Sequence, residues 1–195
     1  MWRSTPGRVI DRLRNAFRRR PGIIVERLDL DTDDALDLTR YAFDTVLCIN
    51  VLEHTADDVA ALKRANQLLQ PGGRVIVYVP AGKDLYGSLD RGVGHQRRYE
   101  KDELVSKLQE AGFDVEEVSF QNQIARMAWW FNSRLFKRQG LPAAQSRIFD
   151  RLVPFLKAFE GQRPASGLSL IAVGRKPGAQ SAKREEALTA AGAAS

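Results

Sequence analysis

Residues 94–99, GHQRRY, gather the side chains best suited to acid–base and anion-binding chemistry in this sequence. Imidazole groups titrate near neutral pH, so His95 is a candidate general base. Arg97 and Arg98 carry planar guanidinium groups that suit carboxylates or phosphates. Glycines just before the histidine make the backbone adaptable. The pattern indicates a site for a polar small molecule. Three further residues of this region are candidates to line that site: Tyr86, Asp90 and Tyr99.

Structural roles compete with this interpretation. Arg97 or Arg98 can pair with Asp90 or Glu100 to fold the segment, and Tyr99 can anchor it by packing. Because the two arginines are adjacent, we expect one to be structural and the other to contact a ligand.

A second polar group follows the apolar run Thr45–Ile49. Ligands of open α/β sheets bind beyond the carboxyl ends of strands, which makes Asn50 and Val51 candidates for binding. Asn50 also suits a turn, and Glu53 also suits the positive end of a helix. His54 either lies near a ligand or makes a structural hydrogen bond. We identify no metal-binding pattern in the sequence.

The elements that must position these residues are clearest between residues 43 and 80. Thr45–Ile49 and Val75–Val79 are short β-branched runs that predict buried strands. Between them, apolar residues recur at helical spacing from Val59 to Leu69, and we expect Gly72 and Gly73 to end that helix. A strand, a helix and a strand with a short return predict a right-handed parallel crossover.

The remaining pattern predicts further elements on both sides of this unit. We expect an Arg-rich helix up to Pro21, a strand at Ile23–Leu30, and a helix in which Ala35, Leu38 and Tyr41 face inward. We expect residues 80–99 to form a long glycine-rich loop. The later elements are a helix over 100–111, a strand over 113–120, helices over 123–138 and 148–159, and an antiparallel strand over 168–173.

Length, charge and composition narrow the class of protein. The chain has 195 residues, 44% of them hydrophobic, and one cysteine, Cys48, which we interpret as an inert core thiol. No apolar run approaches the ~20 residues of a membrane-spanning helix, and we expect a cytoplasmic protein. The net charge is +6, and the basic residues are concentrated at the two ends of the chain, on either side of an acidic centre. This distribution differs from the basic stripe that is typical of a nucleic-acid-binding surface. The basic ends and residues 129–131, WWF, permit peripheral membrane contact, although solvated helix faces and core packing are the more common explanations of such features.

Five stretches of sequence together resemble a known family. They are FDTVLCIN (43–50), VLEH (51–54), the Asp57-Asp58 pair, LLQPGG (68–73) and LYGSLDRGVGHQRRY (85–99). In this order they are similar to the second half of class I S-adenosylmethionine-dependent methyltransferases, over residues 9–176. The resemblance implies an α/β, Rossmann-like, mostly parallel sheet with an antiparallel last strand, and S-adenosylmethionine as cofactor.

The resemblance also implies roles for particular residues. In the family, the acidic residue at the position of Asp29 accepts a hydrogen bond from the adenine amino group, and the residue at Leu30 gives its backbone N–H to the ring. Asn50 and Val51 then lie along the methionine part of the cofactor, with His54 nearby. The substrate-binding residues it implies are those of the loop: Tyr86, Asp90, His95, Arg97, Arg98 and Tyr99.

One part of the family pattern is missing from this sequence. The family begins with a strand, a GxGxG turn, a helix and a second strand ending in an acid that binds the ribose; no GxG precedes Ile23 here. These strands lie between the strands expected at Ile23 and Thr45. We therefore expect a fold that is incomplete at its amino-terminal side, or one that a partner completes.

The resulting hypothesis is methyl transfer from S-adenosylmethionine to a small-molecule acceptor, such as a glycan or a lipid-linked sugar. The alternative is a truncated, non-catalytic remnant or a subunit completed by a partner. A nicotinamide-dependent dehydrogenase fits less well, because VLEH and LxPGG do not belong to that class. We expect a basic helix over 1–22, the α/β domain over 23–176 with a helical insertion at 123–160, and a disordered tail over 177–195.

Overall fold

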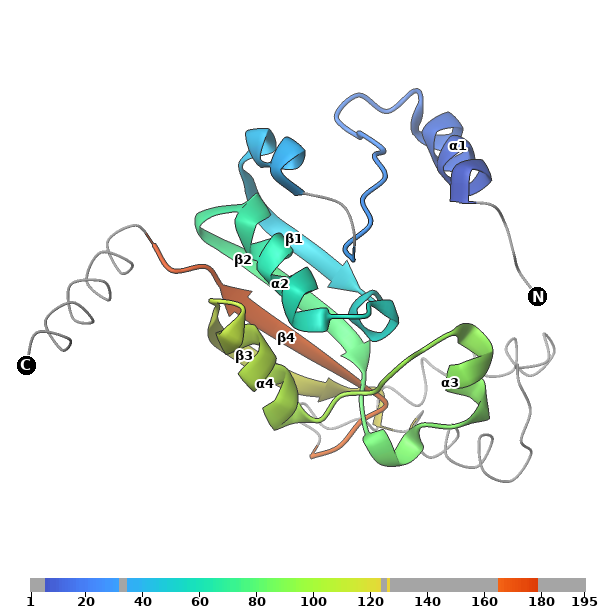
Figure 1. Ribbon diagram of the computed structural model, residues 1–195, viewed down its shortest axis with the longest axis vertical. Coiled ribbons are helices and arrows are strands. Elements are labelled where there is room, and N and C mark those ends of the chain that lie inside the picture. Colours follow the sequence, from blue (N-terminus) through green and yellow to red (C-terminus); the bar gives the residue numbers. More distant parts are fainter. Residues whose placement is uncertain (1–5, 32–34, 124–125, 127–164, 179–195) are drawn as a thin grey trace, which may run out of the picture.

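The computed structural model describes residues 6–31, 35–123, 126 and 165–178, and these form a mixed α/β unit (Figure 1). Its four-stranded sheet has the order β1-β2-β4-β3. The strands are β1 (Phe43–Ile49), β2 (Leu69–Pro80), β3 (Asp114–Gln121) and β4 (Ser169–Arg175). β1 and β2 are parallel, and β4 is antiparallel to both β2 and β3. The predicted parallel crossover and antiparallel last strand are confirmed.

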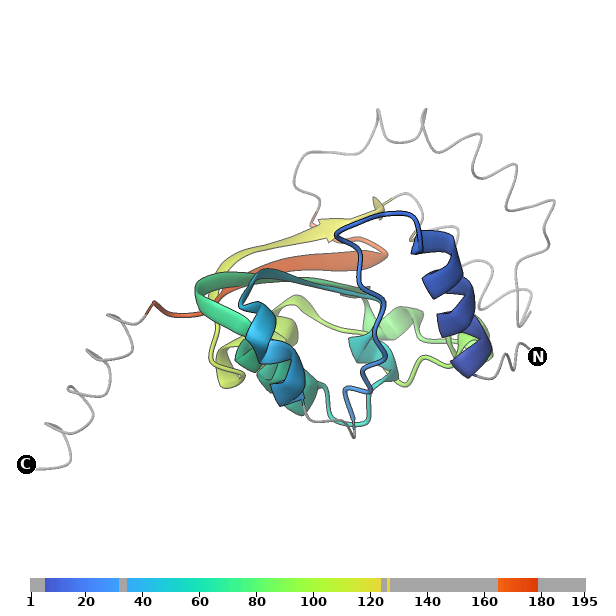
Figure 2. The same ribbon diagram turned by 90° about the horizontal axis from the view of Figure 1, so that it is seen from above.

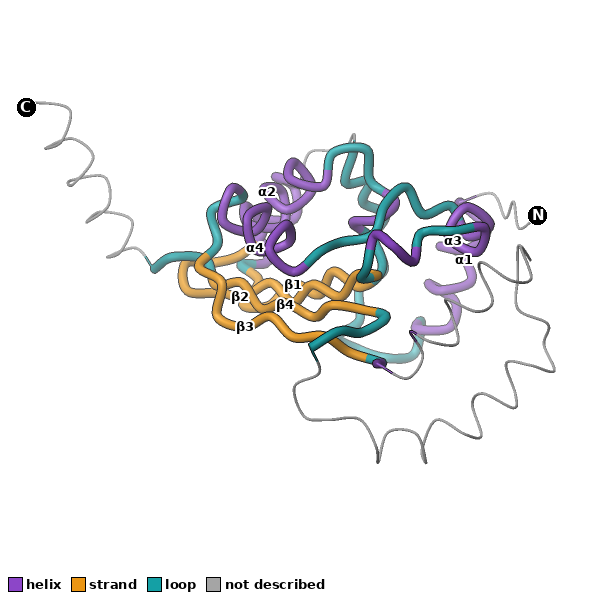
Figure 3. The backbone as a smooth tube through the Cα atoms, turned by 90° about the horizontal axis from the view of Figure 1, so that it is seen from below, coloured by secondary structure: helices purple, strands orange, loops and turns teal. Residues whose placement is uncertain are grey.

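Two helices cover one face of this sheet, as Figures 2 and 3 show: α2 (Asp58–Leu68) and α4 (Lys101–Glu110). Every third or fourth residue of each helix is apolar, and these residues meet the inward side chains of the strands. Leu62 and Leu104 are fully buried, as are Val75 and Val77 of β2. Cys48 of β1 lies in the same core, where burial and then the charge of Glu53 raise the pKa of its thiol to about 12, so this thiol is inert at neutral pH.

The other face of β1 is uncovered by the described residues. Leu47 and Ile49 are 62% and 53% exposed, whereas Cys48 between them is buried. Alternation of this kind follows from the period of two in a strand. β1 is also an edge strand, because its one neighbour among the described residues is β2.

The turn between α2 and β2 differs from our expectation. Asp57 caps the start of α2, since its carboxylate accepts the N–H of Ala60 at 2.9 Å, and the helix ends at Leu68. The prediction that Gly72 and Gly73 end this helix is wrong. The chain leaves the helix earlier, because Pro71 disfavours a helical conformation in the residue before it and offers no N–H. Both glycines lie within β2 instead.

Residues 23–30 do not form the predicted strand. A strand needs a neighbour for its backbone hydrogen bonds, and among the described residues none pairs with the outer edge of β1. Leu30 still packs against the core, and its carbonyl accepts a hydrogen bond from Arg64 Nη1 at 2.6 Å. The apolar pattern here therefore reflects partial burial without strand pairing.

The segment before β1 is a 3₁₀ helix, η1 (Ala35–Tyr41), rather than a regular α-helix. Tyr41 is 40% exposed, so the expectation that it faces inward is wrong. Its ring packs at the surface, 5.7 Å from the ring of Phe43 and 4.8 Å from the guanidinium of Arg40. A cation and a neighbouring aromatic ring hold it there.

Residues 81–99 are more ordered than the predicted loop. They contain the 3₁₀ helix η3 (Lys83–Leu85) and the helix α3 (Ser88–Val93), which ends at Gly94 in the left-handed conformation. Leu85 and Leu89 are buried and fasten this segment to the rest of the protein. The burial of these two leucines explains why this glycine-rich segment adopts a defined structure.

At the amino-terminal side, α1 (Pro6–Phe17) lies apart from the sheet (Figures 1 and 2). Arg14 joins it to the next segment through the carbonyl of Val25 at 3.2 Å and the carboxylate of Glu26 at 3.7 Å. Within the described residues no helix has the length and hydropathy to cross a membrane. The helices expected over 123–138 and 148–159, with residues 129–131, lie outside the described residues except at positions 123 and 126.

Candidate functional site

The candidate site lies where β1 ends. Asn50 follows the strand in the left-handed conformation, with φ of 50°, and its N–H donates to the carbonyl of Tyr78 at 2.9 Å. Asparagine tolerates this conformation better than most residues. Its side chain is exposed. Val51, half-buried, leads into the short 3₁₀ helix η2 (Leu52–His54). The predicted contacts of Asn50 and Val51 with a cofactor remain predictions.

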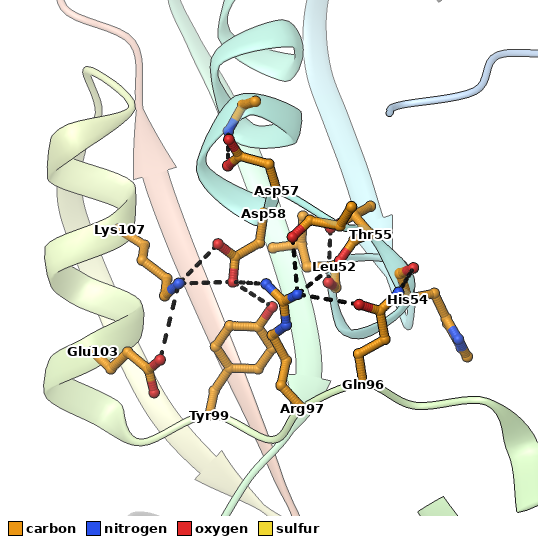
Figure 4. Close-up of polar contacts among 12 residues, drawn as sticks. Leu52, His54, Thr55, Asp57, Asp58, Gln96, Arg97, Tyr99, Glu103 and Lys107 are labelled. Carbon is orange, nitrogen blue, oxygen red and sulfur yellow. Dashed lines mark hydrogen bonds and ion pairs between the residues drawn. The ribbon is translucent and has the colours of Figure 1, made fainter. Parts of the chain in front are cut away.

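The GHQRRY segment lies beside η2, although the two are far apart in the sequence. Gln96 donates its backbone N–H to the carbonyl of Glu53 and its side-chain amide to the carbonyl of His54, both at 2.8 Å. His54 Nδ1 lies 3.0 Å from the carbonyl of Gly94. Figure 4 shows Gln96 directed at the His54 backbone. The fold thus joins the two groups that sequence analysis singled out separately.

A cluster of Glu53, His54 and His95 forms at this junction. The two imidazole rings pack edge to face with centroids 4.9 Å apart. His95 Nε2 lies 3.8 Å from Glu53 Oε1. Glu53 is fully buried, and neither carboxylate oxygen has a hydrogen-bond partner among the described residues. Burial raises the pKa of Glu53, and its backbone hydrogen bond and nearby positive charge offset this only in part.

Asp90 orients His95 from the other side. Its buried carboxylate lies 3.0 Å from His95 Nδ1 and accepts Arg98 Nε at 2.8 Å and the N–H of Gly87 at 2.9 Å. Burial raises the pKa of Asp90, but the His95 hydrogen bond and the Arg98 charge outweigh it and hold this pKa below its usual range. A hydrogen bond from Nδ1–H to Asp90 leaves the lone pair of His95 on Nε2.

The two adjacent arginines both have partners inside the protein. Arg97 lies 3.1 Å from the carboxylate of Asp58 and donates to the carbonyls of Thr55 and Ala56, each at 3.0 Å (Figure 4). Arg98 is buried and, besides Asp90, donates to the carbonyl of Ala81 at 2.9 Å. The geometry supplies a structural role for each, and contact of either with a ligand remains a prediction.

Asp58 is the second carboxylate at which several donors meet. Its oxygens accept Lys107 Nζ at 2.8 Å and the hydroxyl of the fully buried Tyr99 at 2.9 Å, in addition to Arg97 (Figure 4). Burial raises the pKa of Asp58, yet the hydrogen bonds from Lys107, Tyr99 and Arg97 bring it below its usual range. Tyr99 is therefore the packing anchor that its sequence position allowed.

Three other candidates lie around this centre. The Tyr86 hydroxyl donates to the carbonyl of His95 at 2.9 Å. Asp29 accepts the N–H of Asp31 at 3.0 Å, which is a local turn. Leu30 lies between the core and Arg64. The adenine contacts inferred for Asp29 and Leu30 remain predictions.

Sequence analysis explained Glu53 by its place at a helix start and did not single out Asp58 as a site residue. A buried carboxylate looks the same in a sequence as an exposed one at a helix start. Their positions could have pointed to them, because Glu53 belongs to VLEH and Asp58 to the Asp57-Asp58 pair, two of the stretches on which the family resemblance rests.

The chain is similar in sequence to methyltransferases. A family model described as "Methyltransferase domain" matches residues 6–75. The chain is 27% identical over 165 residues to 27-O-demethylrifamycin SV methyltransferase of Amycolatopsis mediterranei, covering 78% of this chain and 60% of that protein. It is 31% identical over 91 residues to ubiquinone biosynthesis O-methyltransferase of Xanthomonas euvesicatoria, covering 40% of this chain and 38% of that protein.

Among solved structures, the fold is similar to an S-adenosylmethionine-dependent methyltransferase from Mesorhizobium loti, with a TM-score of 0.54 and 16% identity over 87% of this chain and 76% of that one. The fold is thus α/β and Rossmann-like, of the class I methyltransferase type. Over residues 6–75 the sequence is similar to a methyltransferase domain. The chain spans between 38% and 60% of the length of the two curated relatives.

Proposed function

We propose that this chain acts in methyl transfer from S-adenosylmethionine to a hydroxyl group of a small molecule. The names of the two curated relatives both describe O-methylation of a small molecule, which supports a hydroxyl acceptor. The sequence-based hypothesis of a glycan or lipid-linked sugar is a narrower form of the same proposal, since such acceptors are rich in hydroxyl groups.

The observation that carries the proposal is the orientation of His95 beside η2, the short helix that follows β1. Asp90 holds the ring by Nδ1, which leaves Nε2 free to accept a proton. A hydroxyl acceptor must lose its proton as its oxygen forms the bond to the methyl carbon. In this proposal His95 Nε2 takes that proton. The bound cofactor supplies an activated methyl group on a sulfonium centre.

The described residues fit one side of such a cofactor. Asn50 is exposed at the carboxyl end of β1, the end at which open α/β sheets bind ligands. Asp29 and Leu30 lie at the end of the segment that precedes η1, where Arg64 fastens the backbone. The sequence contains no GxGxG turn before Ile23 for the other side.

The rival proposal is a subunit that becomes active only when a partner completes the sheet, or a non-catalytic remnant. The exposed face of β1, and its outer edge, which no described residue pairs with, support the partner-completed subunit. A strand edge of this kind is a ready site for strand addition. This rival is compatible with methyl transfer by the completed assembly, and sedimentation velocity can test it through the self-association of the chain.

Calorimetric titration of residues 1–195 with S-adenosylmethionine tests the main proposal. We expect measurable but weak binding, because the acid that binds the ribose in the family is missing from this sequence. Losing such a charge-assisted hydrogen bond costs about 1.5–3 kcal/mol, or roughly 10- to 150-fold in affinity. Asn50→Gly should weaken it further. Asn122→Gly is the matched control, since Asn122 has a similar left-handed φ of 58° and lies at the end of β3.

Transfer is then measured with labelled cofactor and a panel of sugar and phenol hydroxyls. His95→Gln should lower the rate by about 10²–10⁴-fold if the imidazole is the base. No binding of the cofactor at any concentration would rule out methyl transfer by this chain alone. Equal affinities for the two asparagine variants would contradict the placement at Asn50.

A further inference from the structure

We propose that Glu53, His54 and His95 form a binding site for a divalent transition-metal ion. Their candidate ligand atoms all lie within 4.8 Å of one another, so small side-chain rotations would let a single ion touch all three. This proposal goes beyond methyl transfer and does not depend on it.

The outer contacts of both histidines already match those of metal ligands. A histidine that binds a metal usually donates its other ring N–H to a carboxylate or a backbone carbonyl, which fixes the tautomer and the ring orientation. His95 Nδ1 meets the Asp90 carboxylate at 3.0 Å, and His54 Nδ1 meets the carbonyl of Gly94 at 3.0 Å. In both rings Nε2 is left to carry the lone pair.

Glu53 supplies the independent observation. Its side chain is fully buried, and both oxygens lack a hydrogen-bond partner in the described part of the chain. A buried carboxylate without hydrogen bonds is costly, because it loses its hydration without replacement. A cation between Glu53 and the two imidazoles would provide the missing partner. The exposed His54 leaves this position open to solvent from one side.

The donor set indicates which ions are favoured. Two imidazole nitrogens and one carboxylate suit Zn²⁺, Co²⁺, Fe²⁺ or Mn²⁺, whereas Mg²⁺ and Ca²⁺ prefer oxygen ligands. Three protein ligands leave a coordination position for a water molecule or a substrate atom. The sequence analysis found no such pattern, because the third ligand comes from a different part of the chain.

Metal binding and general-base catalysis make different demands on His95. Both use the lone pair of Nε2, so they exclude each other. Without a metal, His95 Nε2 lies 3.8 Å from Glu53 Oε1, which is beyond hydrogen-bond distance. The metal-free chain keeps the lone pair of His95 available as a base, so metal binding and methyl transfer are tested separately.

The experiment is a titration of the tag-free 195-residue chain with Co²⁺, followed by absorption, and with Zn²⁺, followed by calorimetry. The chain contains only two histidines, so imidazole coordination of Co²⁺ would report on this site alone. We expect one ion per chain and weaker binding of Mg²⁺. Glu53→Gln and His54→Gln should each lower the affinity at least about tenfold. Glu117→Gln, on the exposed side of β3, is the matched control and should bind as the wild type does.

The thermal unfolding of each variant is recorded with and without Zn²⁺. Stabilisation by the ion in the wild type and in Glu117→Gln, but not in Glu53→Gln, would support the site. His54 is exposed, so His54→Gln tests coordination without disturbing the core. The absence of one-to-one binding by the wild type, or unchanged affinity in both ligand variants, would overturn the proposal. All measurements are made without S-adenosylmethionine, so they are independent of the methyltransferase proposal.

Discussion

At the scale of single residues, the run Arg97-Arg98-Tyr99 acts as a set of cross-links. Successive side chains of an extended segment point in opposite directions. Arg97 and Tyr99 accordingly meet Asp58 at the start of α2, and Arg98 meets Asp90 in α3. The same three residues that suggest ligand binding in the sequence thus hold the GHQRRY segment in place. This arrangement leaves the Glu53 carboxylate as the polar group of the site that has no hydrogen-bond partner among the described residues.

Asp58→Asn tests the importance of the Asp58 contacts for stability. The amide loses the charge that Lys107 and Arg97 both pair with, and part of the acceptor capacity used by Tyr99. Because the cations remain partly exposed, we expect a loss of roughly 2–3 kcal/mol in the free energy of unfolding. Denaturant unfolding at neutral pH measures it. Asp114→Asn, an exposed carboxylate at the start of β3, is the control, and an equal loss in both variants would contradict the prediction.

The same carboxylate predicts a pH dependence. The folded-state pKa of Asp58 is lowered by its donors, so its contribution to stability is present above the unfolded-state value of about 3.9 and is lost as the pH falls through the folded-state pKa. Wild-type stability should fall in this acidic range. The difference between wild type and Asp58→Asn should shrink over the same interval. A difference that stays constant with pH would show that Asp58 acts through packing alone.

At the scale of elements, the sequence LLQPGG is explained by how closely β2 approaches β1. A Cβ atom at Gly73 would lie 2.9 Å from the carbonyl oxygens of Asp44 and Gln70. Gly72 has φ of 83°, which other residues rarely adopt. The helix has already ended at Leu68, so these glycines serve the entry into β2 rather than the end of α2.

Gly73→Ala should therefore destabilise the protein by about 1–3 kcal/mol, because backbone atoms must move to admit the methyl group. Thermal unfolding by circular dichroism measures the effect. Gly178→Ala is the control, since a Cβ there meets nothing within 4 Å. A neutral effect at Gly73 would show that the β1–β2 register tolerates a shift at this end, where Phe43 and Thr45 already mark an irregularity.

At the scale of the whole molecule, the side of β1 that no described residue covers is the feature that most needs a neighbour. Exposed strand edges with apolar side chains favour pairing with another chain. We expect concentration-dependent self-association in sedimentation velocity, and Leu47→Lys should suppress it by placing a charge on the exposed face. Val93→Lys, at a similarly exposed apolar position on α3, should leave association unchanged. A chain that stays monomeric at every concentration would argue against the partner-completed subunit.

The local sequence determined the helices and strands whose apolar residues recur with a clear period. β1, β2, α2 and α4 follow from apolar periodicity, and β4 was expected as an antiparallel strand from the family resemblance. Tertiary structure alone decided the rest. Ile23–Leu30 has the composition of a strand but, among the described residues, no neighbour with which to exchange hydrogen bonds. Tyr41 has the spacing of a core residue, yet the nearby Arg40 and Phe43 hold it at the surface.

The candidate site, like the fold, was predicted only in part from the sequence. The types of residue in VLEH and GHQRRY indicated polar chemistry, and the position after a strand indicated where it would lie. The partners of each side chain depended on contacts between segments that are distant in sequence. Only the folded chain brings His95 beside Glu53 and His54, and only burial leaves the Glu53 carboxylate without hydrogen bonds from the described residues. Desolvation and long-range contact are properties of the tertiary structure, because no local pattern of residues specifies which groups lose water together.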